Sequence, residues 1–297
     1  MIKDRKFKII DAFLLIFMIL PILGCILLKI LTYPEKEGIS ISGAMVFFEI
    51  NMPIQSLVVG EAQINSIAVL VSVFFLCLFL THGISSGVSL KRHYIAEYVT
   101  EKMQAMVEQN MGKYFSGFAP FVTAILVISA FSSLLTLFGL YAPTSDLNIV
   151  AGWAILVFVL ITYYKFKCGP IQYIKSFASP PLMAPLNIIS EIATPISMAF
   201  RHYGNILSGS VISVLVAYGL SRLSEIILGK LPGFLGGFSF LQVGLPAILS
   251  IYFDIFSGLL QAYIFAMLTM LYISGGFPLE LYEKRKKHKR AELLGGN

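Results

Sequence analysis

Six long runs of apolar residues divide this sequence, and they constrain the fold more than any other feature. A helix that crosses a bilayer needs about 20 predominantly apolar residues. The runs cover residues 9–32, 65–85, 118–141, 149–166, 186–220 and 243–275. The sequence therefore predicts an all-α polytopic membrane protein, a single membrane domain with about six transmembrane helices.

The composition excludes several other classes of protein. Hydrophobic residues make up 57% of the 297 residues and charged residues only 13%, whereas a soluble domain has about 25% charged residues. This excludes a disordered chain, a basic nucleic-acid-binding protein and an ordinary cytosolic enzyme. Cys25, Cys77 and Cys168 lie in or at the end of apolar runs without metal-ligand spacing, so we expect them to pack as small core residues.

Basic residues in the loops predict the orientation of the chain. By the positive-inside rule, the N-terminus, residues 86–117, residues 168–181 and the basic C-terminal tail lie in the cytoplasm. Residues 91–113 carry apolar side chains at helical spacing, which predicts an amphipathic surface helix. Residues 40–61 are mixed in character and predict a short ordered cap.

The first apolar run has two interpretations. With Lys3, Arg5, Lys6 and Lys8 before it, the run could serve as a signal peptide. No convincing small-residue cleavage site follows, however, and the run is longer than the usual 7–15 apolar residues of such a signal. We therefore expect a retained helix in the cell membrane.

The last two runs are too long for ordinary spanning helices. They contain 35 and 33 residues, which corresponds to about 50 Å each, against a hydrocarbon thickness of about 30 Å. Such helices must tilt, bend or lie partly along the membrane. A segment rich in glycine and proline joins them at residues 231–237, so we expect an antiparallel hairpin.

Each of these two long runs contains one isolated charge. Arg201 is the only Lys or Arg between Lys175 and Arg222, and Asp254 is the only conventional charge between residues 231 and 279. A charge inside the membrane costs roughly 2.5–3.5 kcal/mol on insertion scales, so both residues are functional candidates. The alternative is a structural Arg201–Asp254 pair that locks the hairpin.

Other polar residues follow each charge on the same helix face. Helical spacing groups them into two stripes: Arg201, Asn205 and Ser208 on one helix, and Asp254, Ser257 and Gln261 on the other. Two polar stripes on an antiparallel hairpin are typical of the walls of a hydrated path. Gly204, Ser208 and Gly209 leave room for the close approach of another helix.

Three segments resemble subunit a of the F-type ATP synthase of bacteria. Residues 191–209, EIATPISMAFRHYGNILSG, are similar to the E…PxSxxxRLFGNxxxG signature of that family. Residues 260–273, LQAYIFAMLTMLYI, and residues 143–148, PTSDLN, are similar to two further motifs. The resemblance covers about residues 41–276, which leaves 9–32 as an additional N-terminal helix and 277–297 as a basic tail.

The sequence departs from the family pattern at several positions. His202 and Tyr203 stand where the family usually has Leu-Phe, and Ser210 stands where many relatives carry Glu or His. Asp254 occupies a position that is often His or Glu. The charged pair that is common at these last two positions is thus reduced to one carboxylate.

The resemblance implies an ion-translocating stator subunit that is not itself an enzyme and uses no cofactor. Arg201 would face the essential carboxylate of the rotating ring of subunit c and block direct leakage of ions between two half-channels. The implied partners are subunit c, the peripheral stalk subunit b, the remaining ATP synthase subunits, membrane lipid, and H⁺ or Na⁺ as the ion. No nucleic acid is implied.

Other polar residues receive roles by the same resemblance. The outer path would be lined by Asp146, Asn148, Ser210, Asp254 and Ser257. Asn205 and Gln261 would orient water and the arginine, supported by His202 and Ser208, with His202 more often a packing residue than a relay. Glu191 is expected at the cytoplasmic exit, although a carboxylate near a helix start can instead interact with the helix dipole.

Two other classes of function remain as alternatives. One is a secondary transporter or channel that acts alone, although the sequence shows no inverted repeat. The other is a membrane scaffold, against which the two intramembrane charges argue. No nucleotide-binding loop and no catalytic constellation occurs in the sequence.

Overall fold

The structure is a computed structural model. It describes residues 2–32, 44–53, 56–84, 91–170, 173, 184–228, 244–245, 248–249 and 251–277. The predicted linker at residues 231–237 and the basic C-terminal tail lie outside these ranges.

Within the described ranges, six helices are long and apolar enough to cross a membrane, which confirms the predicted fold class. They are α1 (Ile2–Thr32), α2 (Glu61–Thr81), α4 (Ala119–Leu134) with the flanking 3₁₀ turns η2 (Lys113–Phe118) and η3 (Leu135–Phe138), α5 (Leu147–Cys168), α7 (Ala184–Leu228), and α10 (Gly258–Gly275), which continues from the π-helical turn η6 (Ile251–Ser257). A short 3₁₀ turn, η4 (Pro143–Ser145), precedes α5.

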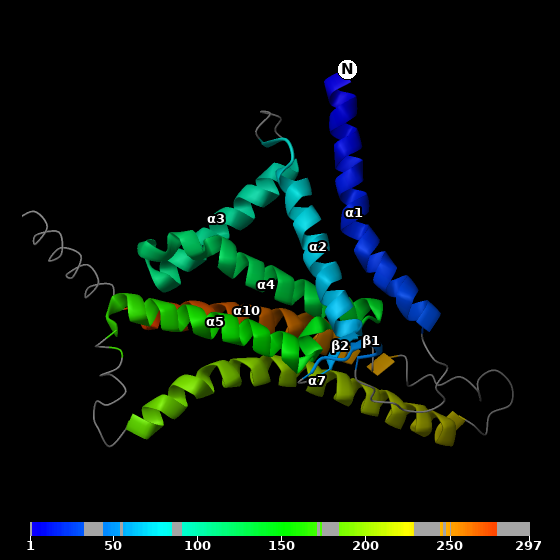
Figure 1. Cartoon of the computed structure of the whole chain (residues 1–297). Helices are drawn as coiled ribbons and strands as arrows, with labels where there is room; N and C mark the ends of the chain where they lie inside the picture. The colour runs from blue at the N-terminus through cyan, green and yellow to red at the C-terminus, as the bar shows by residue number, and fades with distance from the viewer. Residues whose placement is uncertain are drawn as a thin grey trace, which may run out of the picture.

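The helices pack around two apolar clusters. The larger cluster joins α4, α5, α7 and α10 and includes Val122, Val157 and Phe265, all with at most 1% of their surface exposed. The smaller one joins α1 and α2 to η3 around Val69 and Leu135. Figure 1 shows α1 beside α2, and α7 as a long curved helix that runs along α5 and α10.

Helix α7 confirms the prediction of a helix too long for an ordinary membrane span, and it is longer than expected. It contains 45 residues rather than the 35 expected, which corresponds to about 68 Å, more than twice the thickness of the hydrocarbon layer. Pro195 lies inside it, and an internal proline bends a helix because it removes one backbone hydrogen bond. Figure 1 shows the resulting curve, and it also shows α10 running antiparallel to α7.

The second long run begins less regularly than expected. Its described part covers residues 244–245, 248–249 and 251–277, and the π-helical turn η6 directly precedes α10. A π-helical turn holds more residues than an α-helical turn, so the common face predicted for Asp254, Ser257 and Gln261 from α-helical spacing is rotated at this point.

Outside the spans, the cap and the surface helix form as predicted, with differences in detail. The cap is an antiparallel hairpin of β1 (Val46–Ile50) and β2 (Leu57–Gly60). The surface helix is α3 (Lys91–Met111), in which Val107 is buried. Tyr94 is 65% exposed in the chain, so the apolar face predicted for this helix packs against the bundle only in its second half.

The prediction that all three cysteines pack in the core is only partly right. Cys25 is buried between α1 and α2, whereas Cys77 is exposed. Cys77 instead lines a pocket between α2, α3 and α4. The side chain of Cys168 is outside the described part of the structure.

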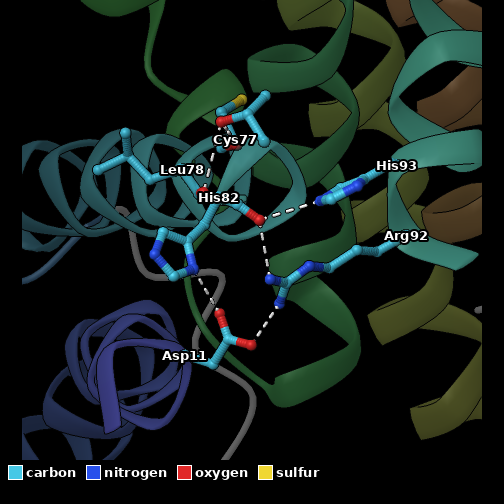
Figure 2. A network of polar contacts seen from close by, with 7 residues as sticks. Asp11, Cys77, Leu78, His82, Arg92 and His93 are labelled. Atoms are coloured by element: carbon cyan, nitrogen blue, oxygen red, sulfur yellow. Dashed lines mark hydrogen bonds and ion pairs between the residues drawn. The ribbon is translucent and has the colours of Figure 1, made fainter. Parts of the chain in front are cut away.

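Polar contacts attach α1 to α2 at both ends. At one end, Asp11 accepts a hydrogen bond from Nδ1 of His82 at 2.8 Å and pairs with Arg92 at 2.9 Å (Figure 2). Arg92 and His93 also contact the carbonyl oxygen of His82, at 2.9 Å each. At the other end, the Lys29 ammonium lies 3.1 Å from the Glu61 carboxylate. These pairs compensate both charges that α1 carries inside the apolar layer.

Candidate functional site

Arg201 lies near the middle of α7 on the face that points away from the other helices. Its side chain is exposed in the chain, as are those of Asn205 and Ser208, which follow at helical spacing on the same face. Among the described residues, Arg201 forms no ion pair, and the proposed Arg201–Asp254 lock is absent. A guanidinium stays protonated at physiological pH, so this face carries a permanent positive charge.

Asn205 connects this exposed face to the interior. Its Nδ2 donates a hydrogen bond to Oε1 of Gln261 at 2.8 Å, and Gln261 is only 2% exposed. The bond joins α7 to α10 one helical turn from Arg201. The structure thus brings together Arg201, Asn205 and Gln261, three of the residues that the sequence singles out.

Of the small residues that the sequence singles out, Gly209 lets the two long helices approach each other closely, whereas Gly204 has open space around its Cβ position and Ser208 is exposed. A Cβ atom added to Gly209 would lie 2.9 Å from the Phe253 ring, too close for any side chain. Similarly, a Cβ atom on Gly258 would lie 2.7 Å from Ser133 of α4.

Asp254 and Ser257 lie half-buried on the π-helical turn beside this contact. π-Helical turns are rare and frequently occur at functional sites. On α7, the hydroxyl groups of Ser208 and Ser210 donate to backbone carbonyls of their own helix, at 3.2 Å and 2.8 Å. Both serines remain exposed, and their oxygens can still accept hydrogen bonds.

His202 points into the core, about 100° around the helix from Arg201. It is fully buried, its Nε2 lies 3.2 Å from Oγ of Ser129, and its ring packs edge-on against Phe265 and Trp153. Nδ1 is buried with no hydrogen-bond partner in the described structure. These contacts fix the rotation of α7, so that the preceding residue, Arg201, points outward. No sequence pattern indicated Ser129 as the partner of His202.

Asp146 and its neighbours form a polar cluster at the opposite end of α5 from Lys165. Asp146 caps α5 by accepting a hydrogen bond from the backbone N–H of Asn148 at 2.8 Å. Its other carboxylate oxygen accepts from Gln63 at 3.0 Å. Glu61, which is 7% exposed, accepts from the Tyr141 backbone N–H at 3.1 Å.

Tyr141 belongs to the same cluster. Burial raises the pKa of Tyr141, and the Asp146 carboxylate acts in the same direction. Its hydroxyl therefore stays protonated and donates to the backbone oxygen of Ser145 at 3.0 Å. The Asn148 side chain is exposed.

Sequence reasoning missed Glu61 and Gln63. Together with Asn65 they place three polar residues at every second position where a spanning run begins. This spacing was the signal that could have revealed Glu61 and Gln63.

Glu191 forms a second polar cluster near the start of α7. Its carboxylate pairs with the Lys165 ammonium at 2.5 Å and accepts from the Tyr173 hydroxyl at 3.3 Å. Glu191 is the eighth residue of α7, whose first turn carries no acidic residue. The helix dipole acts within the first turn, so the interpretation of Glu191 as a dipole partner is wrong.

The two clusters lie at opposite ends of the spanning helix α5. Asp146 and Lys165 are separated by 19 residues of α5, or about 29 Å, close to the thickness of the hydrocarbon layer. Along α7, Arg201 follows Glu191 by ten residues, or about 15 Å. The arrangement is therefore one polar region near each surface and a fixed positive charge at mid-depth.

Fold and site together define a multi-pass membrane protein of the ion-translocating class. Residues 64–274 match the family described as ATP synthase A chain. This match spans more than half of the chain, so the chain belongs to that family, subunit a of the F-type ATP synthase.

Comparison with individual proteins gives the same result. The chain is 30% identical to ATP synthase subunit a 1 of Crocosphaera subtropica over 70% of this chain and 83% of the relative. It is 30% identical to ATP synthase subunit a 1 of Prosthecochloris aestuarii over 72% of this chain and 91% of the relative. It is 26% identical to ATP synthase subunit a of Legionella pneumophila strain Philadelphia 1 over 75% of this chain and 89% of the relative.

Membership of this family establishes the general function. The chain is the ion-translocating, non-catalytic membrane subunit of an ATP synthase complex, and it is embedded in the membrane as a multi-pass protein. No finding favours a transporter that acts alone. The matched region begins at residue 64, after α1 and the β hairpin.

Proposed function

We propose that the exposed face of α7 around Arg201 is the surface that faces the rotating ring of subunit c. The observation that carries this proposal is a permanently charged side chain, exposed and without an ion-pair partner in the described structure, at mid-depth of a membrane-spanning helix. A charge in such a position needs a counter-charge from outside the chain. The ring carboxylate of subunit c supplies it.

The chemistry of this contact follows from the fixed charge. A guanidinium close to a carboxylate favours the ionised form of that carboxylate, so each ring carboxylate releases its ion when it passes Arg201. The same charge repels cations that would cross directly between the two polar regions. Net ion flow then requires rotation of the ring. Asn205 and Gln261 hold the adjoining turn of α7 and orient water beside the arginine.

The two polar regions are the half-channels of this proposal. Asp146, Asn148, Ser210, Asp254 and Ser257 line the outer one. The inner one ends at Glu191, which lines a cavity of about 170 Å³ together with Lys165, Thr194 and Tyr272. The separation of about 15 Å between Glu191 and Arg201 along α7 leaves room for water between them.

The orientation and the remaining partner also belong to this proposal. The basic residues place both termini in the cytoplasm, which makes the Glu191 cluster the cytoplasmic one. The peripheral stalk subunit b is the second membrane partner. Cysteine labelling from either side of sealed vesicles tests the orientation: a cysteine introduced beside the β hairpin should react only from the outside.

The central test is replacement of Arg201 in the complete complex. We expect Arg201→Ala to leave assembly intact and to abolish ATP-driven ion pumping in reconstituted vesicles, because the ring carboxylate then keeps its ion. Arg222→Ala, which removes the other arginine of α7 where it pairs with Glu225 on the exposed surface, is the matched control and should pump normally. Normal pumping by Arg201→Ala would refute the proposal.

The nature of the ion is tested separately. The essential measurement is whether Na⁺ stimulates the ATPase activity of the complex and protects the ring carboxylate from chemical modification. Stimulation and protection identify Na⁺, and their absence identifies H⁺.

A further inference from the structure

The inner polar cluster contains a lysine to which the sequence assigned no role. Lys165 lies in the last turn of α5, and its Nζ is 2.5 Å from Oε1 of Glu191 on α7. Both side chains are largely buried, with 22% and 20% of their surface exposed. The pair therefore lies in the wall of the protein rather than on its open surface.

The end of α10 is shaped to admit the lysine side chain. A Cβ atom on Gly276 would lie 3.0 Å from both Cγ and Cε of Lys165. The glycine thus leaves space for the aliphatic part of Lys165, which passes the end of α10 on its way from α5 to α7. Lys165 and Glu191 are the only charged residues that line the inner cavity in the described structure.

The titratable groups around Glu191 come from three directions. Lys165 faces it from α5, Tyr173 from the segment after α5, and Tyr272 lines the same cavity from α10. Burial raises the pKa of Tyr173, and the neighbouring Glu191 carboxylate acts in the same direction. The Tyr173 hydroxyl therefore remains a hydrogen-bond donor to Glu191. The neighbour on α7 itself, Thr194, does not titrate.

We propose that Lys165 is a positioning residue of the inner ion path, which holds Glu191 at the cavity wall as an ionised carboxylate ready to accept a proton. This rests on the proposed function, in which Glu191 belongs to that path. A proton from water in the path binds to a Glu191 oxygen and displaces the Lys165 hydrogen bond, while Lys165 keeps its own protons. When the carboxylate loses the proton to water on the other side of the cavity, the ion pair forms again.

Removal of the ammonium group should change the pH dependence of ion conduction. A nearby cation favours an ionised carboxylate, and its loss favours the protonated form. In Lys165→Met, the Glu191 carboxylate has lost this cation and the hydrogen bond that holds it at the cavity wall. We expect the midpoint of H⁺ conduction against inner pH to rise by about one unit, with about tenfold slower conduction below that midpoint.

The experiment uses the complete complex in vesicles, with H⁺ conduction measured over a range of inner pH. Lys165→Arg keeps the charge and should restore the original profile. Lys167→Met is the matched control, because Lys167 lies two residues away with its ammonium about 5.7 Å from the Tyr164 ring, and it should leave the profile unchanged. Glu191→Gln should slow conduction and abolish the pH-dependent step.

The outcomes separate this proposal from the proposed function. If Glu191→Gln alters conduction but Lys165→Met keeps the original profile, Lys165 has no positioning role, whereas the inner path stands. If Glu191→Gln changes nothing, Glu191 is not on the path, and both statements about Glu191 fail while the role of Arg201 is untouched. A slower Lys165→Met complex with an unshifted midpoint, or conduction carried by Na⁺ without this profile, also overturns the proposal.

Discussion

The Asn205–Gln261 hydrogen bond ties α7 to α10 beside Arg201, and replacement of each side chain by leucine tests how the two helices hold together. The two partners differ in environment, since Gln261 is 2% exposed and Asn205 is exposed. Removal of Asn205 leaves a buried amide oxygen without its donor. Removal of Gln261 leaves the Asn205 amide on the exposed face of α7, where a water molecule beside Arg201 can replace the lost acceptor.

The magnitudes follow from this asymmetry. An unsatisfied buried polar group costs about 1–3 kcal/mol, so Asn205→Leu should lower the free energy of unfolding by about that amount. Gln261→Leu should cost less, about 0.6 kcal/mol, which is the average for hydrogen bonds between membrane helices. The double variant should have nearly the same free energy of unfolding as Gln261→Leu alone, because a leucine at position 261 needs no hydrogen-bond donor. The coupling energy between the two positions should then be about 1 kcal/mol or more.

Unfolding of the purified chain in mixed micelles, followed by far-UV circular dichroism, measures these differences. Ser208→Leu is the control on the same face, because the Ser208 hydroxyl bonds only within its own helix, at 3.2 Å from the Asn205 carbonyl oxygen. It should change stability by less than about 0.5 kcal/mol. Equal costs for the two single variants, or strictly additive costs in the double variant, would refute the reasoning.

Two further predictions concern Asp146 and Gly209. Asp146→Ala should destabilise the chain by about 1 kcal/mol through loss of the α5 cap, whereas Asp146→Asn keeps a capping oxygen. Slow ion flux in a stable Asp146→Asn complex supports a place on the outer path, and unchanged flux removes it. Gly209→Val should cost about 1–3 kcal/mol, because its side chain meets the Phe253 ring. Gly204→Ala has open space around its Cβ and should be neutral or stabilising in the same assay; a Gly209→Val chain as stable as the unmodified one would contradict the close packing.

The spanning helices were predictable because hydrophobicity over about 20 residues is a local property of the sequence. The true end of α7 was not predictable from the apolar run. Beyond residue 220 the helix continues through a mixed segment in which Arg222 pairs locally: it donates to Tyr218 at 3.1 Å and to Glu225 at 3.1 Å. Pairs at this spacing stabilise an exposed helix without any apolar content.

The candidate site was predictable where a single residue is costly by itself, as at Arg201. It was not predictable where function depends on a distant partner. Glu61 and Lys165 look like ordinary loop charges at the edge of a run, and their partners are 32 and 26 residues away. The buried position of His202 did follow from the helical angle to Arg201, but Ser129, 73 residues away, did not.

The ion pairs at the two ends of α1 affect how the protein enters the membrane during synthesis. Alone in lipid, Asp11 and Lys29 would each carry an insertion cost, lower than the roughly 2.5–3.5 kcal/mol of a charge at the helix centre because both lie toward the ends of α1. Their partners lie on α2 and at the start of α3, so the cost is offset only after these later residues have been made and have come alongside. We therefore expect the first helix to enter the lipid together with the second, as a pair.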